Sequence, residues 1–387
     1  MKLKSFFQPL LCLLLVAFIF VAMGRHKQDR LISFFNKCTH HFFHQESSSL
    51  TGNIKIVGRQ LIVDGKPFIM KGICYNPVRK GGTHPSGLIT LNPSAEDLVA
   101  IEKDFQMMHE AGVNTIRTYE PLLDKRILEL LVKYQLHTIV PVFNYYLAPF
   151  EKVSSIVTRL KNHPSTLIWE VGNEWNHNYF YSKDVDPKNP EGLGFHDSLS
   201  LVKNSARYIK LLDTTHPVST NFSRKALQDE AIWPTLQHLK SIDLFGLNIY
   251  HGLDFDHRLE QWASHMTKPL YLGEFGADAF NTTINAEDDA SQEVATRTLM
   301  TEMFNNLSAL NPNHALVGGC IFEWNDEWWK DLTMAPDVHS TQGIKELGEG
   351  PYPDYVFNEE WWGIVDINRN PRPAYNTLKE LYSGCRP

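Results

Sequence analysis

Two glutamates follow apolar runs that are typical of buried strands. Glu174 comes after residues 167–172, in which Glu170 is the only charged residue, and Glu274 comes after the run 270–273. Cleavage of a glycosidic bond requires such a pair of carboxyl groups, because one protonates the leaving oxygen while the other attacks the anomeric carbon or activates water. A carboxyl separation of about 5 Å indicates attack with retention, whereas about 6.5–9.5 Å leaves room for water and indicates inversion.

Other polar side chains stand at the ends of predicted strands, where barrels of alternating strands and helices carry their catalytic residues. They are Tyr75, Asn76, Arg117, Tyr119, Asn144, Asn173, Asn221, Asn248, Tyr250 and residues 323–326. Among them we expect Asn144 and Asn248 to bind substrate.

The elements that must position these side chains alternate between strand-like runs and amphipathic helices, a pattern that predicts a parallel sheet with crossover helices. The expected strands are 68–75, 113–119, 137–143, 166–172, 217–221, 242–250, 269–275 and 316–324. The expected helices are 95–111, 122–134, 149–161, 197–212, 227–239, 257–266, 289–307 and 374–382. Eight such units favour a closed (β/α)8 TIM barrel of the α/β class over an open sheet, and the GxGxxG turn of an NAD-binding sheet does not follow the first strand. Two short runs at 54–57 and 60–63 predict a hairpin leading into the barrel.

Two of the strand ends resemble a known group of enzymes. Residues 161–174, KNHPSTLIWEVGNE, resemble the fourth-strand motif of retaining β-glycosidases related to glycoside hydrolase family 2, with likeness to family 5. Residues 268–276, KPLYLGEFG, resemble the strand that carries the nucleophile in the same clan. The likeness runs from about residue 52 to the end of the chain. Residues 113–119 and 242–250 also look like the family 72 β-1,3-glucanosyltransferases.

The resemblance implies a role for each matching residue. Glu174 would be the acid/base and Glu274 the nucleophile. Arg117 and Tyr250 would hydrogen-bond Glu274 and keep it ionised, since donors to the charged form stabilise it. Asn173 would hold the 2-hydroxyl of the reacting sugar and Trp324 would floor its binding site. Glu170 would point into the barrel as a buried structural partner.

The N-terminal segment predicts export from the cytoplasm. Lys2 and Lys4 precede an apolar run, residues 10–23, which has the length of a signal peptide and comes close to that of a membrane anchor. We therefore expect a signal peptide or anchor at 1–24, a tether at 25–51 and one catalytic domain at 52–387, located outside the cytoplasm or anchored to the membrane. Asn221, Asn281 and Asn306 begin triplets that would accept glycans in a eukaryotic host.

Composition excludes several classes of partner. The net charge is -7 and no long Lys/Arg run occurs, so nucleic acid is not an expected partner. Cys38, Cys74, Cys320 and Cys385 lack the paired spacing of a zinc site, and the histidines at 40, 41 and 44 have no supporting carboxylate or Cys. We expect no metal and no cofactor. Cys74 and Cys320 fall on neighbouring strands, where free buried thiols are preferred over a disulfide.

These observations predict a retaining β-glycoside hydrolase acting on a β-linked, glucan-like oligo- or polysaccharide. Two alternatives stay open: a β-glucanosyltransferase using the same two glutamates, and an inactive sugar-binding barrel.

The sequence also lacks the β-sandwich domains that precede the barrel in family 2. In the Trp- and Pro-rich stretch 326–362, Trp328, Trp329, Trp361 and Trp362 either stack an acceptor sugar or pack the loop. The oligomeric state and the sugar remain open.

Overall fold

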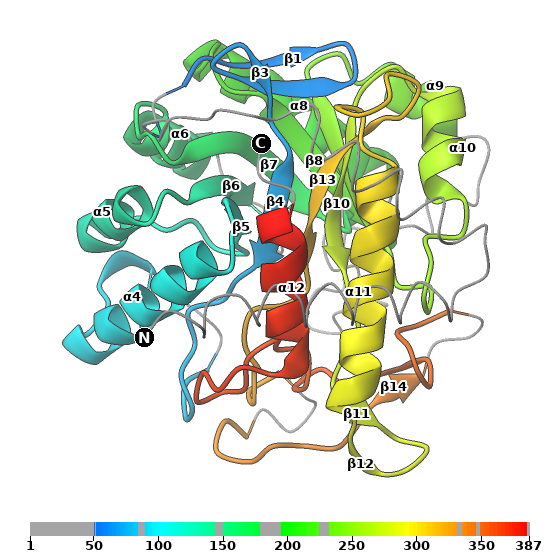
Figure 1. The fold of residues 1–387 in the computed structure, drawn as a ribbon. Helices are drawn as coiled ribbons and strands as arrows, with labels where there is room; N and C mark the ends of the chain where they lie inside the picture. Colours follow the sequence, from blue (N-terminus) through cyan, green and yellow to red (C-terminus); the bar gives the residue numbers. More distant parts are fainter. Residues whose placement is uncertain are drawn as a thin grey trace, which may run out of the picture. The chain divides into compact units, whose positions relative to one another are not determined.

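Eight strands close into a parallel barrel in the described part of the chain (Figure 1). They are β4 (Met70–Cys74), β5 (Thr115–Arg117), β6 (His137–Phe143), β7 (Thr166–Asn173), β8 (Val218–Ser223), β9 (Leu244–Asn248), β10 (Leu270–Phe275) and β13 (Leu316–Ile321). Their order around the barrel is β4-β5-β6-β7-β8-β9-β10-β13, and β13 pairs with β4 to close it. The fold is therefore the predicted (β/α)8 TIM barrel.

The computed structural model describes residues 50, 52–83, 90–143, 150–178, 195–223, 232–330, 335–345 and 349–384. The barrel unit spans Ser48–Ser383. The predicted signal peptide or anchor at 1–24 lies outside the described residues, as do the tether except residue 50, the histidines at 40, 41 and 44, and Cys38 and Cys385. No helix among the described residues is long and apolar enough to cross a membrane.

Helices follow the strands and cover the outside of the barrel. They are α4 (Ala95–Glu110), α5 (Lys125–Lys133), α6 (Phe150–Leu160), α7 (Trp175–Asn178), α8 (Phe195–Leu212), α9 (Ile232–Gln237), α10 (Arg258–His265), α11 (Asp289–Asn305) and α12 (Pro373–Gly384). Ser94 and Asp97 form a reciprocal capping box at the start of α4, in which each side chain accepts a backbone N–H of the other residue. Such a cap satisfies helix N–H groups that have no intrahelical partner.

A hairpin precedes the barrel and packs on the end where the strands begin. Its strands β1 (Ile54–Val57) and β2 (Gln60–Val63) pair antiparallel, and β3 (Lys66–Pro67) continues the sheet. Arg59 in its turn donates to the carbonyls of Ala263, Met266 and Asn313 at 2.6–2.8 Å. Figure 1 shows this hairpin at one end of the barrel, while the short strands β11 (Phe280–Asn281), β12 (Ala286–Glu287) and β14 (Ile344–Lys345) lie at the other. β14 pairs with β15 (Val356–Phe357).

Some predicted strands are longer than the observed ones. β13 ends at Ile321 rather than residue 324. The Phe322 N–H still donates to Phe275 of β10, but the Glu323 N–H donates to Trp362, which lies outside the barrel strands. The predicted helix 227–239 is present as α9, with residues 227–231 outside the described part. Cys74 and Cys320 are buried free thiols, as preferred from the sequence.

Candidate active site

Glu274 lies near the end of β10 with both carboxylate oxygens hydrogen-bonded. Its Oε1 accepts from Arg117 Nη1 at 2.8 Å and from the Tyr119 hydroxyl at 2.7 Å. Its Oε2 accepts from the Tyr250 hydroxyl at 2.9 Å. The side chain is 10% exposed. The hydrogen bonds expected from Arg117 and Tyr250 are confirmed, and together the three donors hold the carboxylate in one orientation.

Arg117 links two carboxylates inside the barrel. Its side chain is fully buried, and besides Glu274 it binds Glu170, through Nη2 at 2.8 Å and through Nε at 3.0–3.1 Å. Tyr271 donates to the other side of Glu170. Burial alone would lower the pKa of Arg117, but the charges of Glu170 and Glu274 raise it well above its usual value. The guanidinium is therefore held charged, and Glu170 is the buried structural partner that was expected.

Glu174 immediately follows β7 in a left-handed backbone conformation. Its φ is +49°, and its N–H donates to Asn221 O on β8 at 3.0 Å. A non-glycine residue in this region is disfavoured by about 1–2 kcal/mol, and such strain is common at functional sites. The side chain is half-buried. Burial raises the pKa of Tyr250 well above its usual value, and the charges of Glu274 and Glu174 add to it, so both glutamates act on the same tyrosine.

Three asparagines from neighbouring strands form a buried network beside Glu274. Asn173 Oδ1 accepts from Arg117 at 2.7 Å, from Asn221 at 2.8 Å and from Asn248 at 3.3 Å. Asn221 also donates to Asn248 Oδ1 at 2.6 Å. Because the Asn173 oxygen is engaged by the protein, its amide NH₂ is the group left to donate to a sugar hydroxyl.

Two glycines make room for this network. A Cβ atom at Gly273 would lie 2.4 Å from Asn221 Oδ1, and one at Gly246 would lie 2.5 Å from the same atom. Contacts under 3.0 Å force a shift of the neighbouring atoms. The glycine directly before Glu274 is therefore required by the packing of Asn221 rather than by a turn.

The structure assigns contacts to two residues that had no predicted role in the active site. The available signal was that Tyr119 and Asn221 are polar residues at strand ends. Tyr119 binds Glu274 directly, and Asn221 joins Asn173 to Asn248. Asn221 is also fully buried, so the prediction that it accepts a glycan is wrong for the folded protein.

Other predicted site residues lie elsewhere or are enclosed. Asn144 lies outside the described residues. Asn248 is 2% exposed, and both its amide atoms bind neighbouring asparagines, which places it as a support for Asn173. Trp324 is fully buried and packs edge-on against Tyr375 of α12, with ring centroids 6.1 Å apart. In this structure it therefore offers no open face on which a sugar ring could stack.

Two tryptophans of the stretch 326–362, Trp328 and Trp361, stack on the same histidine. Lys80 Nζ lies 4.2 Å from the Trp328 ring, and His339 stacks on Trp328 at 4.7 Å and on Trp361 at 3.5 Å between centroids. Burial lowers the pKa of His339 to about 4, so the ring is neutral near pH 7. These contacts favour the packing interpretation of the Trp residues over the acceptor platform.

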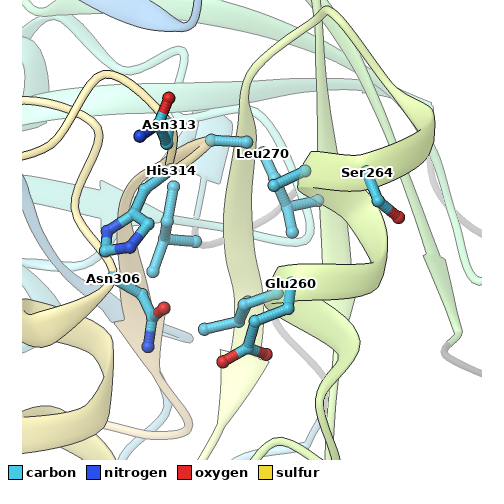
Figure 2. A pocket seen from close by; sticks show the side chains of 10 residues that line it. Glu260, Ser264, Leu270, Asn306, Asn313 and His314 are labelled. Carbon is cyan, nitrogen blue, oxygen red and sulfur yellow. The ribbon is translucent and has the colours of Figure 1, made fainter.

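A separate cavity of about 290 Å³ lies where β10 and β13 begin (Figure 2). Leu270 and Leu316, the first residues of those strands, line it together with residues of α10 and the segment after α11, including Ser264 and His314. Glu274 stands near the other end of β10. The cavity is therefore distinct from the carboxylate site.

Comparison with known proteins places this geometry among glycosidases. The model of the family described as "Glycosyl hydrolases family 2, TIM barrel domain" matches residues 144–386. A β-glucuronidase of Rattus norvegicus is 24% identical over 337 residues, covering 82% of this chain and 47% of the relative. A β-galactosidase of Photobacterium profundum is 28% identical over 160 residues, covering 35% of this chain and 14% of the relative.

Solved structures share the fold. A family 2 β-galacturonidase from Eisenbergiella tayi bound to galacturonate has a TM-score of 0.58 at 18% identity, covering 86% of this chain and 54% of its own. A β-glucuronidase from Bifidobacterium dentium complexed with coumarin-3-O-glucuronide has a TM-score of 0.59 at 16% identity, covering 86% and 49%. The chain thus spans about half the length of these relatives or less.

Proposed function

Because this chain belongs to the glycosyl hydrolases family 2, we propose that it hydrolyses β-glycosidic bonds with retention of anomeric configuration. Glu274 is the nucleophile and Glu174 the acid/base. The observation that carries this proposal is the clamp on Glu274, in which Arg117, Tyr119 and Tyr250 all donate to its carboxylate. Such an arrangement suits an ionised carboxylate kept in a fixed direction for attack.

The reaction proceeds in two displacements on these residues. In the first, Glu174 gives a proton to the leaving oxygen, the bond from that oxygen to the anomeric carbon breaks, and an oxygen of Glu274 bonds to the carbon. In the second, Glu174 takes a proton from water, the water oxygen bonds to the anomeric carbon, and Glu274 leaves as a carboxylate. The amide of Asn173 donates to the 2-hydroxyl of the sugar that is being transferred.

As the substrate we propose a β-linked, glucan-like oligo- or polysaccharide. The transferase alternative uses the same glycosyl-enzyme and differs in whether a sugar hydroxyl reaches it before water. It would require an acceptor platform, and Lys80 and His339 already contact the ring of Trp328, the half-buried tryptophan of this loop. An inactive barrel has no need for glutamates at the ends of both β7 and β10, with a three-donor clamp on one of them.

An activated 2-fluoro glycoside tests the proposal, because it traps the glycosyl-enzyme of a retaining enzyme. We expect mass spectrometry of peptides to find the label on Glu274. Glu274→Gln and Glu174→Gln should each lower kcat by at least about 1,000-fold, with Glu380→Gln on the outer helix α12 as the control. Label on another carboxylate, or a first product of inverted configuration in NMR spectra, would reject the mechanism.

We also propose that residues 1–24 direct the catalytic domain out of the cytoplasm, supported by Lys2, Lys4 and the apolar run after them. Fractionation of expressing cells tests this. Recovery of the folded domain in the cytoplasm alone, with residues 1–24 still attached, would reject it.

A further inference from the structure

We infer that the active site is selective for a neutral sugar and discriminates against the corresponding uronate, through the group formed by Lys330, Glu323, Glu327 and Glu359. This inference rests on the proposed function and names the class of sugar that the site accepts.

Lys330 is surrounded by three carboxyl groups. Its Nζ lies 3.2 Å from Glu359, 3.3 Å from Glu327 and 3.9 Å from Glu323. Glu323 and Glu327 are buried, whereas the side chains of Lys330 and Glu359 are 23% and 32% exposed. The side chains of Lys330 and Glu359 are therefore partly exposed to solvent, and the neighbouring carboxyl groups already neutralise the ammonium of Lys330.

Phe322 connects this group to the nucleophile. Lys330 Nζ lies 4.3 Å from the centroid of the Phe322 ring. The same ring packs edge-on against Tyr119 and Tyr250, at 6.3 Å between centroids in each case. Those two tyrosines donate to the two oxygens of Glu274. Lys330 and its carboxylates are thus one aromatic ring away from the clamp, close enough to act electrostatically on a sugar bound there.

The charges near the clamp leave no surplus cation among the residues just described. Burial raises the pKa of Glu323 well above its usual value, and the adjacent Glu327 raises it further. Glu327 and Glu359 oppose the single charge of Lys330. The other cation at the site, Arg117, is fully buried between Glu170 and Glu274.

A uronate would bring a further negative charge into this environment. Two like charges about 7 Å apart repel by about 2 kcal/mol at an effective dielectric constant near 20. A neutral sugar that carries a hydroxymethyl group at the same carbon avoids this repulsion, and its hydroxyls can donate to carboxylates. We therefore expect the charge at that carbon to decide between the two classes of substrate.

Lys80 is another cation among the described residues. Lys80 is exposed and lies over the ring of Trp328 rather than within an ion pair. Its Nζ lies 4.2 Å from the centroid of that ring. A role for Lys80 in binding a uronate is the competing interpretation that the experiment must test.

Matched chromogenic substrates test the inference, using the full chain. Each pair shares the leaving group and the ring configuration and differs at C6: β-glucoside with β-glucuronide, β-galactoside with β-galacturonide, and β-mannoside with β-mannuronide. For the pair that is cleaved best, we expect kcat/KM for the neutral member to exceed that for the uronide by at least about 30-fold, the factor that corresponds to the repulsion above. A uronide cleaved as well as or better than its neutral partner would overturn the inference while supporting the proposed function. Cleavage of no pair by the folded protein would reject both.

Variants locate the selectivity. Glu359→Gln frees part of the Lys330 charge, so we expect the uronide-to-neutral ratio of kcat/KM to rise about tenfold. Glu380→Gln removes a partly exposed carboxylate on α12 that pairs with Arg297, and should leave the ratio unchanged. An unchanged ratio in Glu359→Gln, or loss of uronide cleavage in Lys80→Gln, would overturn the assignment to this group.

Discussion

Replacement of Tyr119 by Phe removes one hydrogen bond to Glu274 and leaves the aromatic ring in place. The Tyr119 hydroxyl lies 2.7 Å from Glu274 Oε1 and 3.1 Å from Arg117 Nη1, and the side chain is 5% exposed. The variant therefore keeps its packing against Phe322 but leaves Oε1 with the single donor Arg117. A carboxylate held by fewer donors is less often in the orientation that attack requires.

The expected size of the effect follows from the type of hydrogen bond. A bond to a charged group contributes about 1.5–3 kcal/mol, which corresponds to a loss of about 10- to 150-fold in kcat/KM if the full amount is used to orient Glu274. The same loss applied to folding would lower Tm by only about 2–4 °C in a domain of this size. Activity at 25 °C should therefore fall far more than the folded fraction.

Tyr271→Phe is the matched control. Tyr271 is also buried and also donates to a carboxylate bound by Arg117, but that carboxylate is Glu170, which does not belong to the reacting pair. We expect a similar fall in Tm and a change of less than about fivefold in kcat/KM. Steady-state kinetics with the best substrate and calorimetry of both variants provide the measurement. Equal losses of activity in the two variants, or normal activity in Tyr119→Phe, would refute the clamp as the orienting device.

Three further changes test other features of the structure. Burial lowers the pKa of His137 to about 4, so below pH 6.5 the folded protein binds fewer protons than the unfolded chain. The free energy of unfolding should therefore fall by about 3 kcal/mol between pH 6.5 and pH 4. Denaturant titrations should show a smaller dependence on pH in His137→Gln. Ser94→Ala removes the side-chain acceptor of the Asp97 N–H at the start of α4. It should lower the free energy of unfolding by about 1 kcal/mol in the same titrations. An unchanged value would show that this cap does not stabilise the helix. Trp328→Ala should lower Tm without changing the ratio of hydrolysis to transfer at any acceptor concentration, because Lys80 and His339 already contact the ring. Mass spectrometry of the products measures this ratio. A shift toward hydrolysis would support the interpretation of Trp328 as an acceptor platform.

Local patterns in the sequence were sufficient to predict the barrel and the positions of Glu174 and Glu274 at strand ends. Most barrel strands are short runs rich in apolar residues and buried on both faces, and such runs between amphipathic helices are recognisable without knowledge of the contacts they make. The capping box at Ser94 is equally local, since both of its hydrogen bonds span three residues. The contacts of Arg117 and Tyr250 with Glu274 were predicted because their motifs resemble those of known enzymes.

Contacts across the interior of the barrel were decided by the tertiary structure alone. Tyr119 and Glu274 are 155 residues apart, and Asn173 and Asn221 are 48 apart, so nothing in the local pattern links them. The same limit explains Trp324, which the resemblance to known enzymes indicated as the floor of the sugar site but which the closed barrel buries against Tyr375. Periodicity reports that a side chain is buried. Which side chains meet inside a closed barrel depends on strand register and on the space left by residues such as Gly246 and Gly273, and these exist only once the chain has folded.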